Sequence, residues 1–262
     1  MNRFTRVSLV LLSALFLAQG SAFAQDKSLQ VTIVTTSDGV EVVGQLEYGG
    51  LPASAPIIAL FHQAGSNGRG EYGPLFSWLN ENGFSAIAWD LRKGGDHFGS
   101  MNITARSRKG LDESFCDSYP DMVAAVEKTI AVAEGAPVII WGSSYSASLV
   151  FRAAAEIEGV DAVIAFSPAS GGPMVDCHAG LYVNDVSIPA FALRPASEME
   201  SENSKAQRVI LESAGVKFAV IENGVHGSSM LVDDRTGHDM SSARAVVMAW
   251  LKSVSAIAPS MK

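Results

Sequence analysis

Residues 138–149, VIIWGSSYSASL, constrain the fold of this chain more than any other stretch. The first four residues are apolar and mostly β-branched, which predicts a strand buried on both faces. The next five, Gly-Ser-Ser-Tyr-Ser, lie close to the G-x-S-x-G pattern of a sharp strand-to-helix turn that carries a nucleophilic serine. We therefore expect the chain to pass here from a buried strand into a helix, through a turn built around one serine.

The spacing of small residues selects the serine at the centre of that turn. The central residue has a strained backbone, so the residues two before and two after it must be small. Gly142 and Ser146 meet this condition around Ser144. A turn centred one residue earlier would crowd a tryptophan and a tyrosine, and one centred on Ser146 would lack a glycine. We predict Ser144 as the nucleophile; the alternative is a serine-rich helix start, because serine is a common N-cap.

The first 24 residues have the features of an export signal. Arg3 and Arg6 precede an apolar run over residues 7–18, and Ala-Phe-Ala follows at 22–24. The apolar run is shorter than the roughly 20 residues that a membrane-spanning helix needs. We therefore expect cleavage before Gln25, a periplasmic or secreted location, and no membrane association after cleavage.

Residues 25–262 are expected to form a single domain. The chain has 262 residues, of which 48% are hydrophobic, so it can bury a substantial core. The net charge is −8 and no long basic block is present, which argues against nucleic acid as a partner. In an oxidising compartment, Cys116 and Cys177 are predicted to form a disulfide; two separate buried thiols are the alternative.

The order of the predicted elements indicates an α/β fold. Alternating residues around Asp38-Gly39 predict an antiparallel hairpin over residues 31–46. Further strands are predicted at 57–61, 84–89, 138–141, 162–166, 190–193 and 217–221. Helices are predicted at 72–82, 120–134, 145–158, 202–213 and 240–257, with long loops at 91–119 and 167–189. This alternation predicts a mostly parallel central sheet with helices on both faces, preceded by the hairpin.

A serine nucleophile needs a base and an orienting acid, and in such a sheet sites form at the carboxyl ends of the strands. His226 is the predicted base, because it lies in a glycine-flanked loop just past the last strand. The other four histidines lie in the long loops, at a strand end or at a helix entry. The acid is expected after the preceding strand, where Glu198 is the first candidate and Glu200 the second. The alternative for both Glu198 and Glu200 is an ordinary surface position without a catalytic role.

Two backbone amides are expected to stabilise the developing negative charge, each by about 3 kcal/mol. The amide of Tyr145, directly after the nucleophile and at a helix N-terminus, is one candidate. The other is in the HQAGS loop after the strand at 57–61: Ala64 first and Gln63 second. No metal-binding or dinucleotide-binding motif of a familiar kind occurs, so no metal or organic cofactor is expected.

Together these motifs resemble those of the α/β-hydrolase fold family, in its dienelactone-hydrolase-like and small serine esterase branch. The resemblance rests on LFHQAGS from residue 60, AWDLRKGG from 88, IIWGSSYSAS from 139 and NGVHG from 223, and it covers nearly all of the mature chain. The order of Ser144, Glu198 and His226 matches the nucleophile, acid and base order of the family.

The chain departs from the family pattern at several points. Ser146 replaces the second glycine of the turn, a glutamate stands where aspartate is commoner, and His-Gln replaces the usual His-Gly before Ala64. Dienelactone hydrolases themselves use a cysteine nucleophile where this chain has Ser144. The resemblance therefore does not imply specificity for lactones.

The resemblance implies an exported serine hydrolase that cleaves an ester or related acyl bond of a small molecule through an acyl-enzyme. Alternatives are a peptidase and a non-catalytic ligand-binding protein on the same scaffold. Because the two long loops both leave carboxyl ends of strands, a bridge between Cys116 and Cys177 is expected to join two walls of the site and narrow its entrance.

Overall fold

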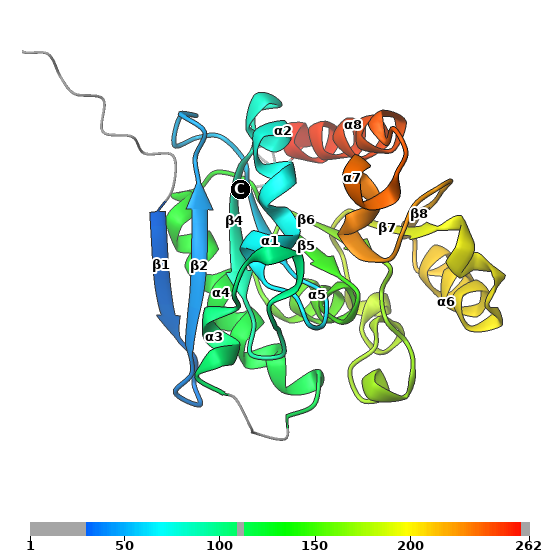
Figure 1. Ribbon diagram of the computed structural model, residues 1–262, viewed down its shortest axis with the longest axis horizontal. Coiled ribbons are helices and arrows are strands. Elements are labelled where there is room, and N and C mark those ends of the chain that lie inside the picture. Colours follow the sequence, from blue (N-terminus) through cyan, green and yellow to red (C-terminus); the bar gives the residue numbers. More distant parts are fainter. Residues whose placement is uncertain (1–29, 109–112, 258–262) are drawn as a thin grey trace, which may run out of the picture.

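The computed structural model describes residues 30–108 and 113–257, so the predicted export signal and its cleavage site lie outside the described residues. Within these ranges, eight strands form one sheet in the order β1-β2-β4-β3-β5-β6-β7-β8 (Figure 1). The strands are β1 Gln30–Thr35, β2 Glu41–Glu47, β3 Ile57–Phe61, β4 Ser85–Asp90, β5 Val138–Ser143, β6 Ala162–Phe166, β7 Ala190–Pro195 and β8 Lys217–Ile221. Strand β2 pairs antiparallel with both β1 and β4, and strands β3 to β8 run parallel to one another. The predicted fold class is confirmed.

Helices cover both faces of this sheet (Figure 1). They are α1 Gly68–Tyr72, α2 Phe76–Glu81, α3 Ile103–Arg106, α4 Tyr119–Ala133, α5 Tyr145–Glu156, α6 Glu202–Ser213, α7 Asp233–Thr236 and α8 Ser241–Ile257. Apolar residues of α4 and α5 form one core cluster with the sheet, and those of α1, α2 and α8 form another on the opposite face. Every residue of β3 to β7 is buried, as covering on both faces requires. Among the described helices, none has the length and apolar character to cross a bilayer.

The helix predicted at residues 72–82 is wrong in its boundaries. The chain instead forms α1, a 3-10 turn at Gly73–Leu75 and then α2. Asn67 caps α1, since its side chain accepts a hydrogen bond from the Gly70 amide, and Pro74 is the second residue of the 3-10 turn. Proline lacks an amide donor and interrupts a regular α-helical hydrogen-bond ladder, so two short helices replace one.

The two long segments predicted as loops contain short helical turns. Residues 91–119 include α3, and residues 167–189 include three 3-10 turns. Helix α7, after β8, was also missing from the prediction. Elements of four or five residues are shorter than the window in which hydrophobic periodicity becomes visible. Helix α3 is stabilised by a local cap instead, because the Asn102 side chain accepts a hydrogen bond from the Ala105 amide at 2.6 Å.

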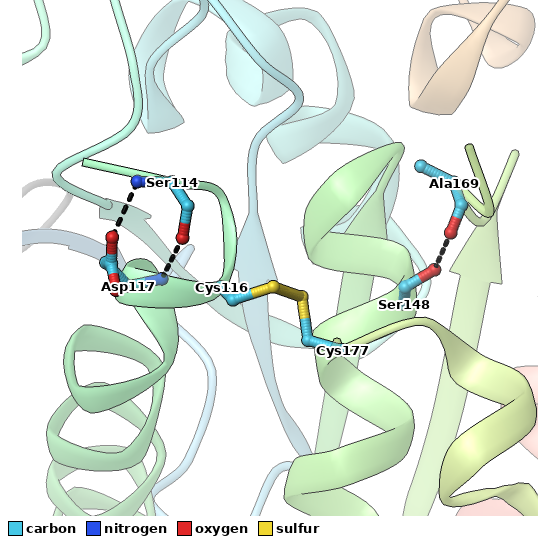
Figure 2. Close-up of a disulfide and its surroundings, with 6 residues drawn as sticks. All are labelled: Ser114, Cys116, Asp117, Ser148, Ala169 and Cys177. Atoms are coloured by element: carbon cyan, nitrogen blue, oxygen red, sulfur yellow. Dashed lines mark hydrogen bonds between the residues drawn. A yellow bond between two sulfur atoms is a disulfide. The ribbon is translucent and has the colours of Figure 1, made fainter. Parts of the chain in front are cut away.

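The predicted disulfide between Cys116 and Cys177 is present, with the two Cα atoms 5.7 Å apart. Figure 2 shows that it joins the 3-10 turn before α4 to the segment that passes beside α5. Ser114 and Asp117 bond to each other around Cys116, and Ser148 of α5 donates to the Ala169 carbonyl at 2.6 Å. The bridge therefore connects the two long segments that leave β4 and β6.

Candidate active site

Ser144 lies in the tight turn between β5 and α5 and has a strained backbone. Its φ of 59° and ψ of −116° lie outside the regions that L-residues ordinarily occupy. At Gly142, two residues earlier, a Cβ atom would lie 2.5 Å from the Ser146 carbonyl oxygen. The strained residue is therefore the serine that the spacing predicts. Position 142 requires glycine, because the backbone of Ser146 lies too close for a Cβ atom.

Ser146 replaces the second glycine of the motif because its hydroxyl fits a buried polar position. The residue is fully buried. Its Oγ accepts a hydrogen bond from the Ser143 amide at 2.9 Å and donates to the Phe61 carbonyl at 2.7 Å. These bonds fasten the turn to the end of β3, so the departure from the glycine pattern stabilises the turn.

Glu198 and His226 meet at the same edge of the sheet. Their side chains join through Oε1 and Nδ1, 2.6 Å apart. The His226 side chain is 51% exposed and that of Glu198 is 20% exposed, so the imidazole stays accessible while the carboxylate is shielded. Glu200, the second candidate acid, is exposed. The geometry therefore pairs His226 with Glu198.

Arg194, which sequence reasoning missed, holds the second oxygen of this carboxylate. It is buried on β7 and donates to Glu198 Oε2, and also to Gln207 Oε1 at 2.6 Å. Burial acts to raise the pKa of Glu198, but the bond to His226 and the positive charges of His226 and Arg194 outweigh it and lower the pKa. The carboxylate is thereby kept ionised. The available signal was an arginine directly after the apolar strand predicted at residues 190–193.

The loop that carries His226 reaches back over the sheet to the end of β5. The Ser228 amide donates to Ser143 Oγ at 3.0 Å, and the Gly227 amide donates to Ser167 Oγ at 3.1 Å. Ser143 directly precedes Ser144, so these bonds hold the His226 loop over the turn. Within the described residues the Ser144 hydroxyl itself makes no hydrogen bond, and catalytic contacts of this kind commonly tighten only when substrate binds.

The two proposed oxyanion donors lie just beyond the ends of two neighbouring strands, β3 and β5. Strands β3 and β5 pair with Phe61 opposite Gly142, so Ala64 and Tyr145, each three residues further on, reach the same edge. Tyr145 is the first residue of α5, where the amide has no partner within the helix. The Gln63 amide instead donates to Glu71 Oε2 at 2.7 Å. Gln63 is therefore not available as the alternative donor, and Ala64 remains the candidate.

His62 has a structural role at the base of this loop. Its Nδ1 bonds to the Gln63 carbonyl at 2.8 Å, and its Nε2 accepts from the Leu91 amide at 2.9 Å and from Asn102 Nδ2 at 3.1 Å. Complete burial lowers the pKa of His62 to about 4, so the ring is neutral and locked in the Nδ1–H tautomer. It fastens the loop after β3 to the segment after β4.

A cavity of about 690 Å³ opens beside the Ala64 loop. Its lining includes Lys93, Arg106 and Phe115. The Phe115 ring stacks on Tyr145, with ring centroids 5.0 Å apart, and Cys116 is the next residue. The disulfide thus anchors a wall between this cavity and the turn at Ser144. In the described part of the chain, no cluster of three or more His, Cys, Asp or Glu residues is arranged to hold a metal ion.

Comparisons with known proteins agree with this architecture. The sequence model of a family described as "Serine aminopeptidase, S33" matches residues 53–226. No curated protein matches the sequence significantly.

Among solved structures, the esterase Pf2001 of Pyrococcus furiosus aligns with a TM-score of 0.64 and 16% identity, covering 87% of this chain and 91% of the esterase. Dienelactone hydrolase from Anabaena variabilis aligns with a TM-score of 0.61 and 17% identity, covering 86% of this chain and 98% of that one. Acylaminoacyl peptidase of Pyrococcus horikoshii aligns with a TM-score of 0.62 and 14% identity, over 86% of this chain but only 41% of the peptidase. At these identities the likeness establishes the shared fold.

Proposed function

The chain belongs to the serine aminopeptidase S33 family of α/β-hydrolases, and from this premise we propose that Ser144, Glu198 and His226 form a triad that cleaves an ester or related acyl bond. The observation that carries the proposal is the bond between His226 Nδ1 and Glu198 Oε1, which lies at the same sheet edge as the strained Ser144. A base oriented by an acid, at the same sheet edge as a half-buried serine, is the arrangement that nucleophilic acyl transfer requires.

In this mechanism His226 Nε2 takes the Ser144 proton as Oγ attacks the acyl carbonyl. Glu198 keeps the Nδ1–H tautomer and stabilises the imidazolium that forms. The Tyr145 and Ala64 amides donate to the oxyanion, each contributing about 3 kcal/mol to transition-state stabilisation. The protonated imidazole then gives its proton to the leaving group, and water releases the acyl group by the same sequence of proton transfers.

An ester is favoured over a peptide as the substrate by the extent of the structural matches. The aligned region accounts for 91% of the Pyrococcus furiosus esterase and 98% of the dienelactone hydrolase, but for 41% of the acylaminoacyl peptidase. The cavity beside Ala64 is the proposed binding place for part of a small acyl substrate. Peptidase activity remains the second candidate, because the name of the family refers to aminopeptidases.

We also propose that the protein acts in the periplasm or outside the cell, with no membrane association after its signal is removed. The sequence of the first 24 residues supports export. The disulfide between Cys116 and Cys177 supports the same location, because such bonds persist mainly in oxidising compartments.

The test is labelling of the purified protein with a fluorophosphonate probe, followed by mass spectrometry of its peptides. We expect one adduct, on Ser144, which is absent from Ser144→Ala and present in the control Ser148→Ala, a buried serine of α5. No adduct on the wild-type protein would contradict the triad and favour a ligand-binding scaffold. Short acyl p-nitrophenyl esters and aminoacyl p-nitroanilides then separate esterase from aminopeptidase activity.

A further inference from the structure

Glu71 is a deeply buried carboxylate beside the Ala64 loop that the triad does not use. It lies in α1 and is 0% exposed. Its Oε2 accepts the hydrogen bond from the Gln63 amide at 2.7 Å. Its Oε1 is buried and has no hydrogen-bond partner among the described residues. Burying a carboxylate without a partner for one oxygen destabilises the folded protein. The position of Glu71 therefore points to a role in the adjacent loop.

The charged groups around Glu71 do not neutralise it by direct pairing. Arg235 of α7 lies nearby, but its guanidinium donates to the backbone carbonyls of Glu71 and Gly70, at 2.8 and 2.6 Å. Within residues 30–108 and 113–257 the Glu71 carboxylate forms no ion pair. The other titratable groups that face it are His226, Tyr72 and Tyr145. Burial raises the pKa of Glu71 to about 7, although Ser143, the Gln63 amide, Arg235 and His226 offset part of the rise.

The backbone of Gln63 is held at both its amide and its carbonyl. Glu71 takes the N–H, while the C=O accepts from His62 Nδ1 at 2.8 Å and from the Ser66 amide at 3.2 Å. The Gln63 carbonyl and the Ala64 amide belong to one planar trans peptide, so they point in opposite directions. Holding the Gln63 carbonyl against His62 therefore turns the Ala64 N–H away from that ring.

We propose that Glu71 is a positioning residue for the oxyanion hole: by accepting the Gln63 amide, its carboxylate fixes the loop so that the Ala64 N–H faces the acyl carbonyl. The inference rests on the proposed function. Oxyanion donors stabilise the transition state only when they are oriented before the reaction, because reorientation during the reaction would cost part of the gain. Loss of the acceptor would free the Gln63 amide and allow the adjoining peptide to rotate.

The test compares Glu71→Gln, which retains an acceptor oxygen, with Glu71→Met, which has similar length and none. The matched control is Thr129→Val on a different element, α4, which removes the buried acceptor of the hydrogen bond that Trp89 Nε1 donates. Each protein is assayed with p-nitrophenyl acetate and with its thionoacetate, in which sulfur replaces the carbonyl oxygen. Sulfur accepts hydrogen bonds weakly, so the ratio of kcat/KM for the two substrates reports on the oxyanion donors and is insensitive to lost stability.

We expect Glu71→Met to lower kcat for the oxygen ester at least tenfold with KM within twofold, and to lower the oxygen-to-sulfur ratio about tenfold. Glu71→Gln and Thr129→Val should keep the ratio of the wild-type protein. An unchanged ratio in Glu71→Met, or an equal fall in Glu71→Gln, would overturn the positioning role. A wild-type protein that is not labelled on Ser144 would instead contradict the proposed function itself.

A second measurement applies if Glu71→Met does not fold. The amide proton of Gln63 is followed by NMR from pH 5 to 9 in the wild-type protein and in Glu71→Gln. We expect a downfield shift in the wild-type protein as the Glu71 carboxylate ionises, because its bond to the amide strengthens. The shift should be absent from Glu71→Gln. The same shift in both proteins would show that another group causes it, and would overturn the assignment.

Discussion

Glu198 Oε1 lies 2.6 Å from His226 Nδ1, in a hydrogen bond that joins the segments leaving two adjacent parallel strands, β7 and β8. Arg194 donates to the opposite oxygen, Oε2, of the same carboxylate. The carboxylate is therefore held from both sides and presents one oxygen to the imidazole. This arrangement favours the tautomer with the proton on Nδ1 and leaves Nε2 able to accept a proton.

The first prediction concerns Glu198→Gln. With Arg194 holding the amide oxygen, the NH₂ group of the new side chain faces Nδ1 and favours the wrong tautomer. We expect kcat for a p-nitrophenyl ester to fall by about 10³- to 10⁴-fold. The control Glu200→Gln changes an exposed acid two residues away and should retain full activity. An equal loss in both variants would show that Glu198 has no special role.

The second prediction concerns Gly227→Ala. Gly227 has a φ of +68°, and a Cβ there would collide with Ser143 Oγ, which holds the Ser228 amide. The His226 loop must then shift, and we expect about a 100-fold loss of kcat, as misplacement by about 1 Å can cause. Gly237→Ala is the control, because its φ of +71° is similar but its Cβ would meet open space. Gly237→Ala should lower the free energy of unfolding by about 1 kcal/mol and leave activity unchanged. A greater loss of activity in Gly237→Ala than in Gly227→Ala would contradict the role of Gly227 in positioning the His226 loop.

The third prediction concerns the double variant Cys116→Ser, Cys177→Ser. The bridge closes a loop of 61 residues, so its removal should lower the free energy of unfolding by about 4 kcal/mol, as measured by urea titration. The neighbouring Phe115 ring, which stacks on Tyr145, then loses its anchor. We expect KM for small esters to change while kcat is retained at temperatures where the protein is folded. Unchanged kinetics would show that the bridge does not shape the entrance.

The fourth prediction concerns the pH dependence of stability through Glu71. Burial raises its pKa from 4.5 to about 7, so between these values the folded protein binds more protons than the unfolded chain. The stability contributed by this group therefore falls as pH rises from about 4.5 to 7, by on the order of 3 kcal/mol. Glu71→Gln cannot titrate, so its free energy of unfolding relative to wild type should increase between pH 5 and pH 8. The buried Asp90, with a pKa raised to about 6, changes in both proteins alike and cancels.

The strands, the hairpin and the turn at Ser144 could be predicted from sequence because their signals are local. A fully covered strand such as β5 is apolar at nearly every position, and a turn that crowds its backbone needs a residue such as Gly142 at a set spacing. The order of these elements then leaves few topologies open. Short helices such as α3 and α7 were missed, because their stability comes from caps and tertiary contacts.

By itself, the sequence determined the sheet and the strained serine, since each depends on residue types in a local pattern. The bridge between Cys116 and Cys177 was predicted only from the expected oxidising compartment, and the structure brings their Cα atoms to 5.7 Å. Only the tertiary structure decided that His226 bonds to Glu198 while Glu200 faces solvent. It also decided that the Gln63 amide donates its hydrogen bond to Glu71. The reason is physical: a hydrogen bond between segments 8 or 28 residues apart depends on distances of a few tenths of an ångström, which residue type and spacing along the chain do not define.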